Sequence, residues 1–212
     1  MFSNLTPLVR NLIIINVVVF VGQQLIPPFT SCIQSFRGME VPIEIGFTQL
    51  ISLWRIDWCP FKPYQFFTYM FAHGSFLHIF FNMMALASLG PILESYWGDK
   101  KFLFFYLATG IGAGVIYAVA NYFISADNAG SMLGASGAIY GILMAFGLTF
   151  PNMQISLFFI PIKAKYMVFV VGFLTYVMDR SGSVAHLAHF GGAFIAFIMI
   201  SIWRSQGRDR GY

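Results

Sequence analysis

Ser136 is the residue in this chain that is best placed to act as a nucleophile. It belongs to the sequence Gly-Ala-Ser-Gly at 134–137, where a polar stretch gives way to an apolar run that ends near Phe150. This pattern places Ser136 at or near the first turn of a helix, where backbone N–H groups lack an intrahelical acceptor and can hold a negatively charged oxygen. Gly134 and the small residues after it allow another helix to approach closely.

His189 is the residue best placed to activate that serine. It lies in the last apolar segment and is followed by Gly192 and Ala196 at i+3 and i+7, so its imidazole is on the helix face that can pack closest to a neighbour. A serine hydroxyl with an imidazole is the minimum for an activated nucleophile. We therefore predict Ser136 as nucleophile and His189 as general base, with Tyr140, one turn after the serine, stacked on the His189 ring.

Two further polar residues are predicted to support this pair. His78 and Asn82 are four residues apart, so they share one face of a helix, and both can donate hydrogen bonds to an oxyanion. His73 points elsewhere and is expected to bond loop backbone. The only carboxylates near these segment ends, Asp127 and Asp179, lie in loops, so the pattern favours a dyad over a triad.

Other interpretations of the same residues stay open. A Gly-x-Ser-Gly sequence in an apolar helix is often a packing motif. Two histidines on each of two segments are also compatible with a metal site, although no carboxylate or thiol joins them at ligand spacing. Histidines at helix ends are also found as hydrogen-bonded interface residues. We expect neither a cofactor nor a metal.

The composition is that of a membrane protein. Of the 212 residues, 58% are hydrophobic and only 9% are charged, compared with roughly 25% charged in ordinary globular chains. Apolar runs long enough to cross a bilayer recur along the chain, which predicts an all-α, polytopic membrane protein with a single domain over residues 1–212. The net charge of +4 does not indicate nucleic-acid binding, because the basic residues lie at the ends of apolar runs.

These runs predict a bundle of six transmembrane helices with a long outer loop between the first and second spans. The predicted spans are residues 8–27, 64–93, 102–124, 136–150, 165–178 and 184–203. Lys and Arg are more frequent on the side that holds both termini, so we expect both termini to be cytoplasmic. The outer loop, about 28–64, is expected to contain short interfacial helices. It holds both cysteines, Cys32 and Cys59, and the pattern leaves open whether they form a disulfide.

Together these motifs resemble the rhomboid family of intramembrane serine proteases over essentially the whole chain. The resemblance rests on Gly-Ala-Ser-Gly at 134–137, on the His-x4-His-x3-Asn set at 73, 78 and 82, and on Ala-His-x2-Gly-x3-Ala at 188–196. It implies Ser136 as nucleophile, His189 as base, and His78, Asn82 and the Ser136 N–H at the oxyanion site. It also implies a structural role for Glu94.

The chain departs from the family pattern in two places. Many members have Trp-Arg before the second span, where this chain reads Pro63-Tyr64-Gln65, and Ala196 stands where glycine is commoner. The resemblance implies an endopeptidase that cleaves transmembrane protein substrates near the outward face, in contact with membrane lipid. We expect the six-span form found in the bacterial inner membrane. The alternative is a catalytically silent relative that binds membrane proteins.

Overall fold

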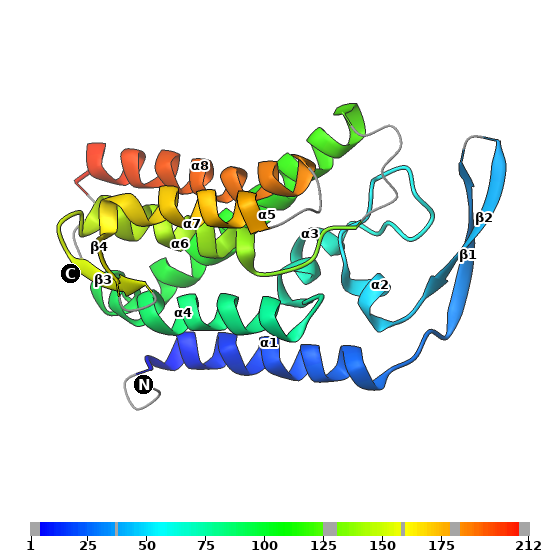
Figure 1. The fold of residues 1–212 in the computed structure, drawn as a ribbon, viewed down its shortest axis with the longest axis horizontal. Helices are drawn as coiled ribbons and strands as arrows, with labels where there is room; N and C mark the ends of the chain where they lie inside the picture. Colours follow the sequence, from blue (N-terminus) through cyan, green and yellow to red (C-terminus); the bar gives the residue numbers. More distant parts are fainter. Residues whose placement is uncertain (1–4, 37, 125–130, 158–159, 179–182, 208–212) are drawn as a thin grey trace.

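Apolar helices that run side by side make up most of the molecule (Figure 1). The computed structural model describes residues 5–36, 38–124, 131–157, 160–178 and 183–207. Its elements are α1 (Pro7–Leu25), β1 (Thr30–Phe36), β2 (Met39–Ile45), α2 (Phe47–Ile51), α3 (Gln65–Thr68), η2 (Tyr69–Phe71), α4 (Phe76–Trp97), α5 (Asp99–Ile124), α6 (Ser136–Thr149), β3 (Gln154–Leu157), β4 (Ile160–Lys163), α7 (Ala164–Met178) and α8 (Ser183–Ser205).

Among the described residues, four helices are long and apolar enough to cross a membrane, namely α1, α4, α5 and α8. The apolar helices α6 and α7 are shorter. We call the end of the bundle at which α6 and α8 begin the site end, and the end at which α1 begins and α8 finishes the termini end (Figure 1).

The predicted second span, 64–93, was wrong at both ends. The chain forms two short helical turns, breaks after Phe71, and begins α4 at Phe76. Ser75 caps α4, because its Oγ accepts a hydrogen bond from the His78 N–H at 3.2 Å. At the other end α4 runs on to Trp97 and finishes at Gly98, whose φ of +82° favours glycine.

The all-α class needs correction, because the described chain also contains two β-hairpins. In the long connection after α1, β1 pairs with β2 in antiparallel register from Thr30 opposite Ile45 to Phe36 opposite Met39. The second hairpin, β3 with β4, joins α6 to α7. The sequence of β2, Met-Glu-Val-Pro-Ile-Glu-Ile, alternates with a period of two, which is the pattern of a strand rather than of an interfacial helix.

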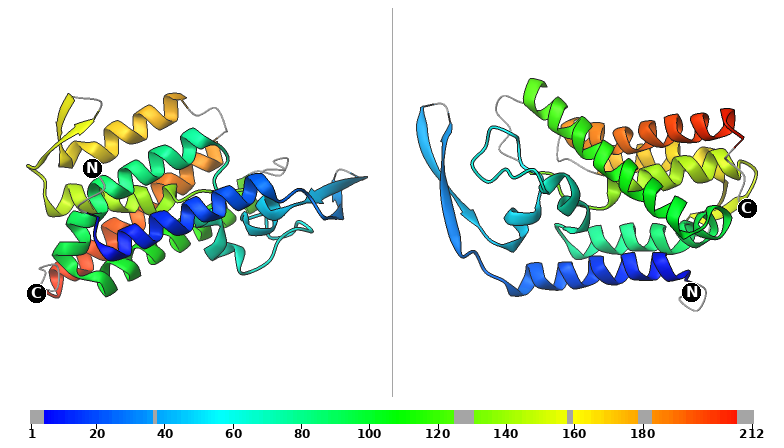
Figure 2. Two further views of the ribbon diagram at one scale, coloured as in Figure 1. Left: turned by 90° about the horizontal axis from the view of Figure 1, so that it is seen from below. Right: turned by 180° about the vertical axis from the view of Figure 1, so that it is seen from behind.

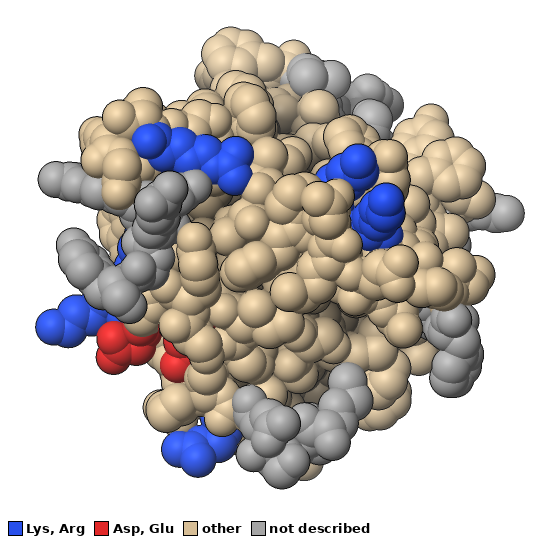
Figure 3. Space-filling model, turned by 90° about the vertical axis from the view of Figure 1, so that its left-hand side faces the viewer, with Lys and Arg blue, Asp and Glu red and all other residues tan. Residues whose placement is uncertain are grey.

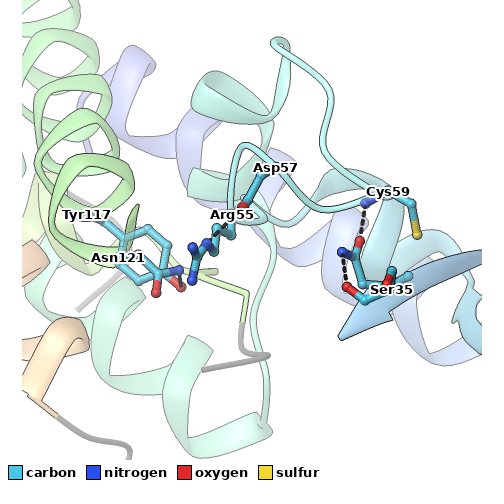
Figure 4. A network of polar contacts seen from close by, with 7 residues as sticks. Ser35, Arg55, Asp57, Cys59, Tyr117 and Asn121 are labelled. Atoms are coloured by element: carbon cyan, nitrogen blue, oxygen red, sulfur yellow. Dashed lines mark hydrogen bonds and ion pairs between the residues drawn. The ribbon is translucent and has the colours of Figure 1, made fainter. Parts of the chain in front are cut away.

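The β1–β2 hairpin projects beyond the helices at the site end (Figures 1 and 2). A disulfide between Cys32 and Cys59 attaches it to the loop before α3, which answers the question that the sequence left open. The Cys59 N–H also donates to the Gln34 side chain at 2.8 Å (Figure 4). An isolated two-stranded hairpin is marginally stable at best, so these contacts hold it in place.

Small residues bring the helices around α6 together. A Cβ at Gly137 would lie 2.6 Å from the Ala113 Cβ of α5, and one at Gly141 would lie 2.8 Å from Thr109 of α5. Real Cβ atoms are essentially never found so close, so these contacts require glycine at positions 137 and 141. The helix α6 therefore lies in the interior of the bundle, in contact with α4, α5, α7 and α8.

At the termini end, Glu94 of α4 caps the start of α1. Its carboxylate accepts hydrogen bonds from the Thr6 hydroxyl and from the backbone N–H groups of Leu8 and Val9, the last at 2.9 Å. A carboxylate at a helix N-terminus is stabilised both by these donors and by the helix dipole. The structural role expected for Glu94 is therefore the joining of α4 to α1.

Candidate active site

Ser136 is the first residue of α6, and the loop that leads to it is held by neighbouring backbone. Met132 and Leu53 exchange two N–H···O bonds of 2.8 Å, and the Gly134 N–H donates to the Tyr69 carbonyl at 2.9 Å. Gly134 has a φ of +122°, which residues with a Cβ rarely adopt. The helical turn η2, through Tyr69, and the connection before α3, through Leu53, thus fix the position at which α6 begins.

The structure brings Ser136 and His189 into contact. The His189 Nε2 lies 2.9 Å from the Ser136 Oγ, within hydrogen-bond distance. The helices that carry them meet just below this pair, because a Cβ at Gly192 would lie only 1.9 Å from the Gly137 carbonyl oxygen. The small-residue face predicted for α8 is therefore the face that reaches α6.

Tyr140 lies flat against the imidazole of His189, as the sequence predicted. The two ring centroids are 4.8 Å apart and the planes differ by 4°. The phenol hydroxyl also donates to Thr175 Oγ1 on α7 at 2.7 Å. His186, by contrast, contacts Tyr176 at 5.1 Å between centroids and lies 6.5 Å from the His189 ring.

His78 lies over Gly134, beside the serine. A Cβ at Gly134 would be 2.7 Å from the His78 Nε2 and 3.7 Å from the Ser136 Oγ. The Gly74 N–H points at the His78 Nδ1 over a long 3.5 Å, so in the neutral ring the proton is assigned to Nε2. An N–H donor of His78 therefore faces the space next to Ser136.

Asn82 is buried, but its amide makes a contact within its own helix. The Nδ2 group donates to the His78 carbonyl at 2.9 Å. The structure thus brings His78, Gly134, Tyr140 and His189 around Ser136, while Asn82 lies one turn below His78. The loop carboxylates Asp127 and Asp179 lie outside the described residues.

His73 bonds loop backbone, as expected, and lies in the connection between η2 and α4. Its Nδ1 is 3.3 Å from the Phe71 carbonyl, and its own N–H donates to the Gln23 side chain at 2.9 Å. The ring meets the His78 ring edge to face, with centroids 5.0 Å apart. Burial, assisted by the neighbouring His78, lowers the pKa of His73 to about 3.

Two glutamines for which no role at the site was predicted hold the layer around it. Besides meeting His73, Gln23 at the end of α1 donates to Thr48 at 3.1 Å. Gln65 is fully buried and joins four backbone groups, accepting from the N–H groups of Trp54 and Lys62 and donating to two carbonyls. The sequence feature that could have identified Gln23 is its position directly after an apolar run.

A second polar cluster ties the same layer to the end of α5 (Figure 4). Arg55 pairs with Asp57 at 2.7 Å and lies over the Tyr122 ring at 5.7 Å. The buried Asn121 donates to the Tyr117 hydroxyl at 3.2 Å on the same helix end. The connection before α3 is therefore braced against α5 as well as against the loop before Ser136.

Comparison of the sequence with known proteins gives a family match for this chain. A family model described as the Rhomboid domain matches residues 60–206. Rhomboid protein 1, mitochondrial, of Saccharomyces cerevisiae is 27% identical over 193 residues, which cover 82% of this chain and 55% of the yeast protein. Presenilin-associated rhomboid-like protein, mitochondrial, of Rattus norvegicus is 27% identical over 64% of this chain and 38% of its own length.

A bacterial protein is similar over a shorter stretch. Rhomboid protease GluP of Bacillus subtilis is 33% identical over 129 residues, covering 58% of this chain and 24% of that protein. The chain spans about half the length of the yeast relative and less of the other two.

Proposed function

Because this chain belongs to the rhomboid family and is an integral membrane protein, we propose that it is an intramembrane serine endopeptidase. Its substrates are transmembrane proteins, which it cleaves near the outward face of the membrane. The observation that carries the proposal is the 2.9 Å contact between His189 Nε2 and Ser136 Oγ. A hydroxyl held by an imidazole at this distance is the arrangement needed for nucleophilic catalysis.

In the proposed reaction the Ser136 oxygen attacks the carbonyl carbon of the scissile peptide bond, and His189 Nε2 takes the serine proton. The resulting oxyanion is held by the Ser136 backbone N–H and by the Nε2–H of His78. His189 then returns the proton to the leaving amine, the C–N bond breaks, and an acyl ester remains on Ser136. Water attacks this ester with His189 as base, which releases the acid and regenerates the hydroxyl.

The His189 ring needs an orienting group, and Tyr140 provides one. In a triad a carboxylate fixes the ring through its second nitrogen. Here the parallel contact with Tyr140 constrains the plane of the imidazole directly. This contact supports a Ser136–His189 dyad in which a phenol ring limits rotation of the base.

The lengths of the helices support a six-span arrangement within one domain. At about 1.5 Å per residue, the 14 residues of α6 are too short to cross a hydrocarbon layer of roughly 30 Å. A short span is tolerated where protein surrounds it, and α6 contacts four other helices. Its start can then lie below the membrane surface while water still reaches Ser136 from the site end.

The distribution of charged side chains supports a position of the termini end on the inner side of the membrane. Lys and Arg side chains are spread over this end of the molecule, with few acidic groups among them (Figure 3). Lys101 there lies 4.5 Å from the centre of the Trp203 ring, as is typical of residues anchored at a membrane interface. We propose that both termini face the cytoplasm or the equivalent compartment. Relatives named as mitochondrial match over more of the chain than the bacterial one, so the comparisons do not favour a bacterial inner membrane.

Labelling with a fluorophosphonate tests the proposal, because only an activated serine reacts quickly with such a probe. The wild-type protein in detergent should gain one label, located on Ser136 by peptide mass spectrometry, and should cleave a model transmembrane substrate. Ser136→Ala should do neither while keeping its melting temperature. An unlabelled wild type would instead indicate a relative that binds membrane proteins without cleaving them.

A further inference from the structure

We propose that Thr175 of α7 is a positioning residue for the reaction. Its hydroxyl holds the Tyr140 ring, and through that ring it holds the imidazole of His189 in the plane required for proton transfer from Ser136. This inference rests on the proposed protease function. It adds a residue on a different helix that touches none of the reacting groups.

The hydrogen bonds run in one direction, from the Tyr140 hydroxyl to Thr175 and from Thr175 to the Val171 carbonyl. Thr175 Oγ1 lies 2.7 Å from the Val171 carbonyl of its own helix, to which it donates its only proton. The same oxygen lies 2.7 Å from the Tyr140 hydroxyl, which must therefore be the donor in that bond. The phenol is thus tied to the backbone of α7 through one threonine side chain, and its other acceptor, the Val171 carbonyl, is 3.4 Å away.

The Tyr140 ring is held on two sides. A Cβ at Gly172 would lie 3.9 Å from the Tyr140 Cε1, in ordinary van der Waals contact, so the ring edge lies against α7. The ring face lies against His189 with the planes 4° apart. The ring is almost fully buried, and its bond to Thr175 is the shorter of the two hydrogen bonds that its hydroxyl makes to α7. We infer that this bond sets the tilt of the ring.

The composition of α7 makes Thr175 unusual. This helix lies at the edge of the bundle (Figure 2), and its large side chains, such as Phe169 and Phe173, are mostly exposed. A threonine hydroxyl in such a helix can bond to a neighbouring helix, and α7 contains no other Ser or Thr. Thr175 is the position at which this edge helix reaches the stack of rings beside Ser136.

Losing the Thr175 hydroxyl should therefore slow the chemistry more than it affects substrate binding. Thr175→Val keeps the β-branched shape and removes the nearer acceptor of the Tyr140 hydroxyl. The hydroxyl is then left with the Val171 carbonyl, now 3.4 Å away, and the ring can tilt toward it. We expect kcat and the rate of fluorophosphonate labelling to fall roughly three- to tenfold, the effect of one neutral hydrogen bond, with KM nearly unchanged. Thr175→Ser, which retains the hydroxyl, should restore most of the rate.

A double-mutant cycle tests whether Thr175 acts through Tyr140. Tyr140→Phe keeps the stacked ring and removes only the donor, so it should lower the labelling rate as much as Thr175→Val. The double variant should be no slower than either single variant. Ser88→Ala is the control, because the exposed Ser88 hydroxyl donates to the Met84 carbonyl of its own helix, α4, at 2.7 Å; its labelling rate should stay near that of the wild type.

The pH profile of labelling separates positioning from loss of structure. If Thr175 orients the base, Thr175→Val should shift the apparent pKa of the profile as well as its height, while the melting temperature stays within about 2 °C of wild type. Equal rates for wild type and Thr175→Val, or multiplicative losses in the cycle, would overturn the inference while leaving the protease proposal intact. A wild type that does not label at all would instead refute the protease proposal.

Discussion

Gly192 of α8 faces the backbone of Gly137 in α6 so closely that a Cβ at position 192 would lie 1.9 Å from the Gly137 carbonyl oxygen. Neither partner in this contact is a flexible side chain. The approach of the two helices, and with it the approach of His189 to Ser136, therefore depends on the absence of one methyl group.

Gly192→Ala should abolish activity and lower stability, because α6 and α8 must move apart to accommodate the methyl group. Overpacking of this kind typically costs about 1–3 kcal/mol. The helices must separate by roughly 1 Å to relieve the 1.9 Å approach, and such a shift carries the 2.9 Å contact between His189 and Ser136 beyond hydrogen-bond distance. Fluorophosphonate labelling and thermal unfolding in detergent measure the two effects. Gly191→Ala is the control, since the atoms nearest to its Cβ would belong to the side chain of Ile116, at 3.0 Å, and not to backbone. Equal losses for the two variants would contradict this explanation.

The two histidines of α8 should differ in their effect on activity. His189 touches Ser136, whereas His186 contacts Tyr176 at the edge of the bundle. His189→Ala should remove all measurable cleavage of a model transmembrane substrate, and His186→Ala should retain a substantial fraction. If His186→Ala proved the inactive variant and His189→Ala kept its activity, the assignment of the base would be wrong.

Much of this arrangement follows from patterns that the sequence displays, and some of it does not. The apolar runs predict the helices, and Gly192 with Ala196 identifies the face of α8 that meets α6. The bond between Tyr140 and Thr175 joins residues 35 positions apart, and a single threonine in an apolar helix gives no local indication of its partner. The hairpin β1–β2 was missed because its alternating pattern is short and interrupted by Pro42.

His78 and Asn82 should both matter for turnover, but to different degrees. The Nε2 of His78 lies beside Gly134 and Ser136, where charge develops, and losing one oxyanion donor typically costs about 10²–10³ in rate. Asn82 donates to the His78 carbonyl, so its removal should act through the position of the first turn of α4. We expect kcat to fall further in His78→Ala than in Asn82→Ala, with KM changing little in both. Full turnover in the folded His78→Ala variant would exclude it from the oxyanion site.

The disulfide should stabilise the hairpin without being required for catalysis. Cys32 and Cys59 are 27 residues apart, and closing a loop of that length is worth about 3–4 kcal/mol in the chain-entropy model. Intact-mass measurement after alkylation should show no label without reductant and two labels with it. Cys32→Ser should increase proteolysis between β1 and β2 but leave Ser136 labelling close to wild type, because Leu53 and Met132 still hold the loop before α6. Loss of labelling would show that the hairpin positions the serine.

The buried His73 should make the protein less stable in mild acid. Its pKa in the folded protein is about 3, whereas an unfolded histidine has a pKa of about 6.5. The stabilisation from the neutral ring is therefore complete above pH 6.5 and is lost as the pH falls from 6.5 toward 3, because only the unfolded chain takes up the proton. At pH 5 this group alone lowers the free energy of unfolding by about 2 kcal/mol. His73→Gln should have a smaller difference in melting temperature between pH 7 and pH 5 than wild type. Parallel pH dependence in wild type and His73→Gln would show that His73 is not held neutral by its surroundings.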